Sequence, residues 1–356
     1  MNWHRHSTSG ALSALAVVCL MTLAVWSWSG RTARASVATG RTGEQLEYMS
    51  PVEVLFSPDG ARLYVLCQES AQVRVLDAKS YELLKDIAVG AVPRGFSLSP
   101  KGDRLFVTNS WDDTISVIDT KTLEVAATWS VGAEPSSVVE DREGKHLFVA
   151  NRISNDVAVL DAQTGMEQKR LAAGRGASYI TASPDGSKLY VTHVYPNATP
   201  HRTAPASEIT VIDTARAVVV DRIALPYVAH GFHVAFSADG RLGVATTMHP
   251  KNLVPLAHLE HGGAFADTLT LFGVDVGKPA EVSLDELELY AARPFGIAIT
   301  PDKTRMFITC GGSEMVTIVD VPRLIRYART HPCSHAQDLS ASASYVMGRI
   351  AVGHDP

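Results

Sequence analysis

The stretch FSPDGARLYVL, residues 56–66, is typical of a tight β-hairpin, because Pro and Gly separate two strand-like segments. Five variants of it follow along the chain: LSPKGDRLFVT (98–108), EDREGKHLFVA (140–150), ASPDGSKLYVT (182–192), FSADGRLGVAT (236–246) and ITPDKTRMFIT (299–309). The first four copies begin 42 residues apart, and the last two follow at longer intervals. A repeat of this length indicates one structural unit written several times.

Each unit contains four short segments that are apolar or alternating, separated by Gly, Pro, Asp and Asn. In the second unit these segments are GFSLS, RLFVT, TISVID and EVAATWSVG. They predict four antiparallel strands, called a to d below. An Asp ends strand c of five units and is placed to cap the turn that follows: Asp77, Asp119, Asp161, Asp213 and Asp320. One such sheet cannot cover both of its faces, so we expect the units to pack around an axis as a β-propeller.

The predicted fold is therefore all-β, a propeller of four-stranded antiparallel blades over residues 36–356. Six complete units are visible, at about 51–90, 93–131, 135–173, 177–223, 230–291 and 294–352. The closing GRIAVGHDP repeats the phrase VG..P that precedes units two and three, which predicts the start of a seventh unit at 353–356. Two interpretations remain open: a seven-bladed type with its last blade truncated, which we favour, or six blades that close imperfectly.

Four repeat segments carry a resemblance to a known family: LYVLCQ (63–68), LFVTNS (105–110), LFVANR (147–152) and LYVTHV (189–194). They resemble the YVTN-type β-propeller repeat of exported bacterial and archaeal proteins, over essentially the whole chain after its N-terminal segment. The resemblance implies a seven-bladed propeller. It does not imply one function, because the family includes lactonase-like enzymes, surface-layer proteins and propellers fused to or partnered with c-type cytochromes.

The N-terminus predicts export. Arg5 precedes an uncharged run over 11–28, and Ala33 and Ala35 form a small-x-small pattern, so residues 1–35 are typical of a signal peptide cleaved before Ser36. The alternative is an uncleaved membrane anchor. Cleavage leaves 29 basic and 37 acidic residues, a net charge of −8. We expect an exported, periplasmic or extracellular protein that binds neither nucleic acid nor, after cleavage, a membrane.

Cysteine usage excludes two classes of protein. After cleavage three cysteines remain, and an odd number argues against a disulfide framework. The sequence has no CxxCH, so we expect no covalent haem c in this chain. Cys67 and Cys310 fall at the end of strand b and are expected to be small buried residues.

Strand direction divides the loops between two faces. The d-to-a and b-to-c loops share one face, here called the top face, and the SPDG and c-to-d turns share the other, here called the underside. Two long b-to-c insertions, 194–208 and 248–267, therefore lie on the top face of neighbouring units. A c-to-d insertion at 321–350 lies on the underside, where Pro322 predicts a short helix. The segment HPCSH (331–335) within it is expected to be structural.

Histidines gather near the two top-face insertions. Seven lie within the 69 residues from 193 to 261, and neutral imidazole is a common ligand of transition metals. One hypothesis is a transition-metal site formed by His193, His233, His258 and His261. The alternative is that these are polar loop residues that hydrogen-bond the backbone. A wider set at the top of the channel is predicted to bind a ligand or partner: Arg94, Asn109, Trp111, Asn151, His193, His230 and His233. The two asparagines also fit a structural role as turn caps.

The leading functional prediction is an exported binding or scaffold module, not itself an enzyme, whose top face engages a small-molecule ligand, a metal or a redox partner. A c-type cytochrome is one such partner, because HPKNLVPLAHLEHGG (249–263) resembles an insertion in longer propellers that carry a haem c domain. The alternative is a lactonase-like or metal-dependent hydrolase that uses the same corner of the top face. The sequence contains no GxSxG and no Gly-rich phosphate loop to support nucleophilic or nucleotide chemistry.

Overall fold

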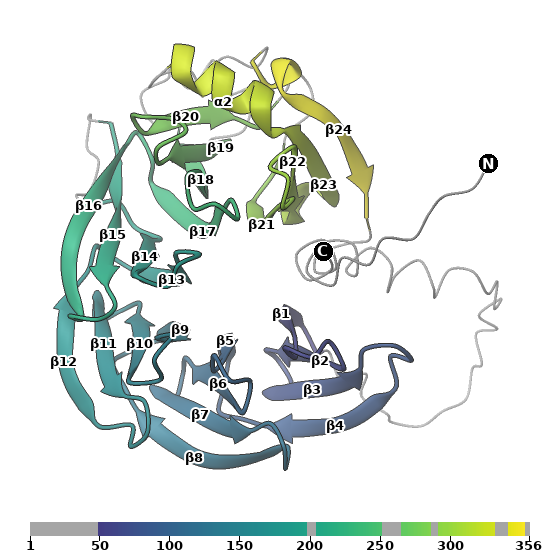
Figure 1. The fold of residues 1–356 in the computed structure, drawn as a ribbon, viewed down its shortest axis with the longest axis vertical. Coiled ribbons are helices and arrows are strands. Elements are labelled where there is room, and N and C mark those ends of the chain that lie inside the picture. Colours follow the sequence, from purple (N-terminus) through teal and green to yellow (C-terminus); the bar gives the residue numbers. More distant parts are fainter. Residues whose placement is uncertain (1–48, 198–203, 251–264, 286–290, 332–340, 353–356) are drawn as a thin grey trace.

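The computed structural model describes residues 49–197, 204–250, 265–285, 291–331 and 341–352. In these segments 24 strands form six four-stranded antiparallel sheets. The sheets follow one another around an axis, with the first strand of each sheet innermost (Figure 1). Within every sheet the spatial order of the strands is their order in the chain. The prediction of an all-β propeller with six four-stranded units is confirmed.

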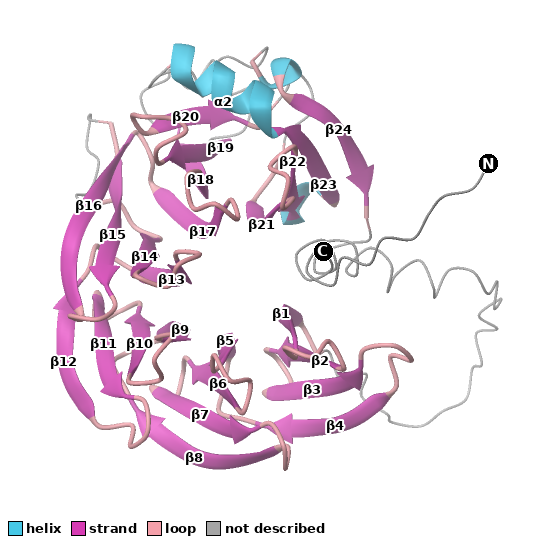
Figure 2. Cartoon of the chain, viewed as in Figure 1, coloured by secondary structure: helices cyan, strands magenta, loops and turns pink. Residues whose placement is uncertain are grey.

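The strands of the first three blades are β1 (Pro51–Phe56), β2 (Arg62–Cys67), β3 (Gln72–Asp77), β4 (Leu83–Ala88), β5 (Pro93–Leu98), β6 (Arg104–Asn109), β7 (Thr114–Asp119), β8 (Glu124–Ser130), β9 (Pro135–Glu140), β10 (His146–Asn151), β11 (Asp156–Asp161) and β12 (Glu167–Ala172). Those of the last three blades are β13 (Ala177–Ala182), β14 (Lys188–His193), β15 (Ala206–Asp213), β16 (Val218–Pro226), β17 (His230–Phe236), β18 (Gly243–Pro250), β19 (Phe265–Phe272), β20 (Ala280–Ser283), β21 (Pro294–Ile299), β22 (Arg305–Cys310), β23 (Met315–Asp320) and β24 (Val346–Ala351). Strands account for most of the described chain (Figure 2).

The hydrophobic core lies between consecutive sheets, not at the axis. Five clusters of buried side chains each join two neighbouring blades. Between the first two blades, for example, Tyr64 and Val75 pack with Phe96 and Leu105. Each sheet thus buries its faces against its neighbours, which is what a propeller requires of a sheet that is apolar on both sides.

The turns on the underside form as their residues predict. In the first blade the Ser57 hydroxyl donates to Asp59, whose carboxylate also accepts the amide of Ala61 at 3.0 Å. Gly60 has a φ of 69°, a left-handed conformation that favours glycine. The predicted capping by the Asp at the end of strand c is confirmed in five blades, because the carboxylate accepts backbone amides of the next turn: Asp77, Asp119, Asp161, Asp213 and Asp320.

The predicted helix in the sixth blade is α2 (Val321–Thr330). Asp320 caps its N-terminus and Pro322 lies in its first turn, where a missing amide hydrogen costs nothing. Its buried side chains, among them Leu324, join the core between the fifth and sixth blades. Two short 3-10 turns, η2 (Gly311–Ser313) and η3 (Ser342–Ser344), complete the described elements.

The first and sixth sheets stand apart in Figure 1, so the described ring is open on that side. No buried cluster among the described residues joins these two sheets. The seventh blade stays a prediction, because residues 353–356 lie outside the described segments, as do the predicted signal peptide over 1–35 and the HPCSH segment apart from its first residue. No helix within the described segments has the length and apolar character needed to span a bilayer.

Candidate functional site

The two predicted asparagines hold the top-face loops in place. Asn109 is buried, accepts the Gly90 amide at 3.0 Å and donates to Thr114 and Ser116. Asn109 is the last residue of strand b in its blade, a position called the slot below. Asn151 is fully buried in the same slot of the third blade. A Cβ added to Gly90 would lie 2.6 Å from the Asn109 amide carbon, so the glycine is required for this close approach. These contacts support a structural role for both asparagines.

His193 occupies the same slot in the fourth blade. It is fully buried, and a Cβ on Gly174 would lie 2.8 Å from its ring. Its Nε2 forms a 3.0 Å hydrogen bond with the Thr210 hydroxyl. Asn109 forms the equivalent bond with the Ser116 hydroxyl in the second blade. Burial lowers the pKa of His193 to about 4, so the ring is neutral at pH 7. The slot explains the histidine as a replacement for asparagine, although its Nδ1 is buried without a partner.

Cysteines fill this slot in the first and sixth blades. Cys67 and Cys310 are both buried and free, as expected. Burial raises the pKa of the Cys310 thiol to about 11, so it carries little thiolate at neutral pH. Neither cysteine has the environment of a reactive nucleophile.

The remaining predicted histidines do not converge within the described segments. His230 begins β17, and its ring lies 6.3 Å from that of Phe232. His233 lies on β17, the innermost strand of the fifth blade, as set out below. His258 and His261 fall outside the described residues. No group of three or more potential metal ligands forms within the described part of the chain, and the metal site stays a prediction.

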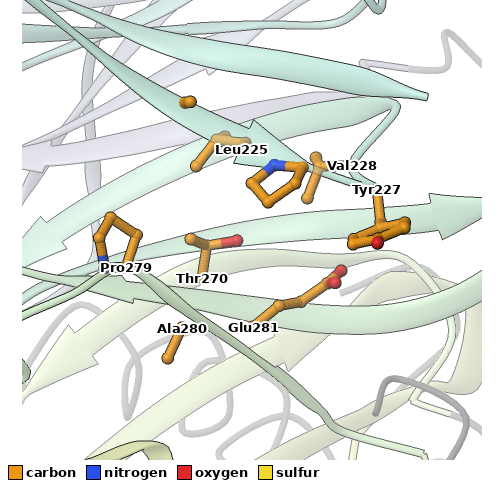
Figure 3. Close-up of a pocket in the computed structure, with 9 residues that line it drawn as sticks. Leu225, Tyr227, Val228, Thr270, Pro279, Ala280 and Glu281 are labelled. Atoms are coloured by element: carbon orange, nitrogen blue, oxygen red, sulfur yellow. The ribbon is translucent and has the colours of Figure 1, made fainter. Parts of the chain in front are cut away.

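A small pocket lies at the predicted corner, between the fourth and fifth blades (Figure 3). Its lining includes Tyr227 and Glu281. His249 connects the two, because its Nδ1 lies 3.2 Å from the Glu281 carboxylate and its ring stacks on Tyr227 at 5.8 Å. The pocket measures about 10 Å³, about the space that one water molecule needs. It has no room for a substrate.

A cluster of side chains on the innermost strands joins distant blades. The innermost strands are irregular at one position: the register slips before Glu53 in β1 and before Tyr179 in β13. Such bulges redirect side chains. His233 holds the corresponding position in β17, because its amide donates to Thr246 as that of Gly95 in β5 does to Thr108. Three large polar side chains therefore project from one level of the ring.

These side chains contact one another near the axis of the ring. The Tyr179 hydroxyl donates to Glu53 Oε1 at 3.0 Å, and the other carboxylate oxygen accepts the Phe96 amide at 3.1 Å. The ring of His233 meets that of Tyr179 edge to face, with centroids 4.9 Å apart. Phe295 completes the aromatic contacts at 6.0 Å from Tyr179. The cluster draws on the first, second, fourth, fifth and sixth blades.

Burial controls the charges in this cluster. It raises the pKa of Glu53 to about 7, although the Phe96 amide and the Tyr179 hydroxyl both favour the ionised form. It lowers the pKa of His233 to about 4. The imidazole is therefore neutral at pH 7, whereas Glu53 exchanges its proton near neutrality. A carboxyl group with this property is suited to taking up and releasing a proton.

Exposed apolar side chains follow the top face of three consecutive blades. Trp111, Ile153 and Tyr195 each lie two residues after the slot described above, and they are 71%, 55% and 37% exposed. We call these three residues the apolar arc. Trp111 belongs to the predicted partner-binding set. Large exposed apolar side chains that gather on one face are typical of protein-binding surfaces.

Arg94, another predicted residue, lies near the arc. It is the second residue of β5, and the charges of Glu134 and Arg152 act on it. The structure thus places Arg94 and Trp111 on the top face of the second blade but buries Asn109, Asn151 and His193 inside the packing.

Comparison with known proteins gives a sequence relative and a structural relative. The chain is 28% identical over 153 residues to hydrazine synthase subunit beta of Kuenenia stuttgartiensis, an alignment that covers 42% of this chain and 40% of that protein. The fold matches a solved chain of Kuenenia stuttgartiensis hydrazine synthase with a TM-score of 0.77 and 25% identity, over 89% of this chain and 91% of that one. The protein resembles a hydrazine synthase subunit. The sequence match spans about two fifths of the curated relative's length. No protein-family model matches the chain, so the YVTN family stays a prediction.

Sequence reasoning missed Tyr179, Ile153 and Tyr195. A signal for Tyr179 was present, because alignment of the six units places Glu53, Tyr179 and His233 at one position of strand a. Ile153 and Tyr195 likewise align with Trp111.

Proposed function

We propose that this chain is a non-catalytic subunit of a larger enzyme complex, and that its top face binds a partner protein. The observation that carries the proposal is the likeness to hydrazine synthase subunit beta in sequence, together with the fold match over nine tenths of this chain. The name of that relative describes one subunit of a multi-subunit enzyme. A fold alone would not support this step.

The apolar arc is the proposed centre of the binding surface. Aromatic side chains dominate the energy of many protein interfaces, and Trp111 is the most exposed large apolar side chain described. The insertion at 194–208 contains Tyr195, the third residue of the arc, and would extend the surface. The second insertion, 248–267, belongs to the next blade. We propose that the partner contacts both insertions.

We further propose that the partner carries a redox centre, with a c-type cytochrome as the leading candidate. The support is the resemblance of residues 249–263 to an insertion in longer propellers with a haem c domain. Export to the periplasm or cell exterior fits such a partner, and the predicted signal peptide supports it. A hydrolase at this corner of the top face has less support, because the pocket lined by Tyr227 and Glu281 holds about one water molecule.

Affinity purification of the tagged chain from its native cells tests the proposal. We expect a protein to co-purify with the wild type and its yield to fall at least tenfold with Trp111→Ser. Met166→Ser is the matched control, because Met166 is 70% exposed but lies in a c-to-d turn on the underside. Both variants should keep the wild-type melting temperature. Equal recovery of the partner with wild type and Trp111→Ser would contradict the proposed surface.

A further inference from the structure

Two arginines, on the second and third blades, lie close enough for the charge of Arg152 to act on Arg94. Arg94 is the displaced residue of the bulge in β5, in the second blade. Arg152 follows directly after β10, in the third blade. The two blades are neighbours, with β5 packed against β9. Glu134, in the loop before β9, interacts with both arginines.

Arg152 is held in a fixed position. Its Nη2 donates to the Tyr195 hydroxyl at 3.0 Å, and its guanidinium lies 5.6 Å from the centre of the Tyr195 ring. Its Nη1 lies 3.6 Å from the Glu134 carboxylate, beyond good hydrogen-bond distance. Its Nε is buried and has no partner. The Arg152 side chain as a whole is 24% exposed, so part of this rigidly placed cation remains open to a ligand.

Arg94 has no side-chain hydrogen bond to any described residue, and its Nε is buried without a partner. Burial lowers the pKa of Arg94, the positive charge of Arg152 lowers it further, and Glu134 opposes both effects. One carboxylate thus faces two guanidinium groups. A partly buried cation without a hydrogen-bonded partner is costly to the folded protein.

The fold itself does not require these charges. The bulge position of Arg94 is held by Val52, Ser136 and Ser178 in three other blades. The position of Arg152 is held by Ser110 in the second blade and Val194 in the fourth. Neutral side chains therefore satisfy the same backbone geometry, which points to a ligand as the reason for the arginines.

We propose that Arg94 and Arg152 form a binding site for a small oxyanion, a carboxylate or a phosphate, with Tyr195 and Glu134 positioning Arg152. Guanidinium groups present paired donors that match the oxygens of both anion types. The bound anion would place a negative charge beside the two guanidinium groups and offset their repulsion.

Thermal unfolding with added anion tests the site on the isolated protein. Inorganic phosphate and acetate are titrated separately, with chloride replaced so that ionic strength stays constant. We expect at least one of them to raise the melting temperature of the wild type saturably, by about 2 °C or more. The probe that acts at the lower concentration assigns the anion class.

The variants Arg94→Met and Arg152→Met keep most of the apolar stem and remove the charge. Both should lose the saturable rise. Arg94→Met should also melt at or above the wild-type temperature without anion, because it removes a repulsive, unpaired cation. Arg326→Met, an exposed arginine on α2, should respond to anion like the wild type.

Two results would overturn the site. One is a wild-type melting temperature that does not rise saturably with either anion; the other is a rise that persists in both Arg94→Met and Arg152→Met. Isothermal titration of the wild type and Arg94→Met with the same anions provides a second measurement that does not depend on unfolding. Neither measurement involves a protein partner, so failure here leaves the proposed subunit role standing.

Discussion

The carboxylate of Glu53, in the first blade, accepts a 3.0 Å hydrogen bond from the hydroxyl of Tyr179, in the fourth, although the residues are 126 positions apart. The bond joins the innermost strands β1 and β13, which belong to blades that are not neighbours in the ring (Figure 1). Among the described residues, the core clusters join only consecutive blades, so the first blade packs on the second alone. The bond to Tyr179 therefore adds a direct contact between the first blade and the fourth.

Glu53 should make stability depend on pH. Its pKa is about 7 in the folded protein, against an ordinary value of 4.5, so the folded state binds the proton more tightly. Its contribution to stability is complete below pH 4.5 and is lost as the pH rises to 7. Glu53→Gln cannot ionise, and its free energy of unfolding relative to wild type should rise by up to about 3 kcal/mol from pH 4.5 to 8. Chemical denaturation across this range measures the difference.

The exposed Glu82 provides the control for this experiment, because Glu82→Gln removes a negative charge far from the channel. Curves for Glu53→Gln and wild type that stay parallel from pH 4.5 to 8 would show that Glu53 titrates as an ordinary surface carboxyl.

Tyr179→Phe removes the hydroxyl but keeps the ring that packs on His233. Loss of the hydrogen bond should lower the free energy of unfolding by about 1 to 2 kcal/mol. The hydroxyl favours ionised Glu53, so its removal should also move the pH midpoint of stability upward. Denaturation at several pH values measures both effects.

Tyr190→Phe, on β14, is the control, because it removes a hydroxyl outside this cluster and should leave the pH midpoint of stability unchanged. An unchanged midpoint in Tyr179→Phe would argue against the bond.

His193→Asn should fold well, because asparagine fills the same slot in the second and third blades. The pKa of His193 is about 4 when folded, against an ordinary 6.5, so protonation of the unfolded chain destabilises the wild type as the pH falls from 6.5 to 4. His193→Asn should not show this destabilisation, so at pH 4 its free energy of unfolding should exceed that of the wild type by up to about 3 kcal/mol. Loss of a bound transition metal in the variant, seen by elemental analysis, would instead favour the metal hypothesis.

Lys303 links the fifth and sixth blades on the underside. Its Nζ lies 2.5 Å from Asp239 and 2.6 Å from Asp275, and hydrogen bonds to it hold the pKa of both carboxyls below their usual values. Lys303→Met should lower the free energy of unfolding by about 1 kcal/mol at low salt and by less in 1 M salt. Denaturation at the two salt concentrations tests this. The effect of Lys121→Met, an exposed control, should be small at both.

The repeats made the fold predictable from sequence, because each hairpin carries its own turn residues and each unit is too thin to be stable alone. Pro322 and Asp320 similarly marked the helix. The hydrogen bond between Tyr179 and Glu53 was harder to predict. Their positions in the strands indicate that both side chains face the axis, but not that they are long enough to meet across it. For His193 the sequence supported two interpretations: the clustering of histidines suggested a metal ligand, and the equivalent position of Asn109 suggested a buried structural group. The structure shows that the ring is buried, and the metal site stays a prediction.

Because each described hydrophobic cluster joins only two neighbouring blades, the blades should differ in how readily they unfold locally. A sheet in the middle of the series shares buried side chains with two neighbours, whereas the described first and sixth sheets each share them with one. Amide hydrogens should therefore exchange fastest in β1 to β4 and β21 to β24 and slowest near the third blade. The proton on Glu53 would then govern how often the first sheet detaches.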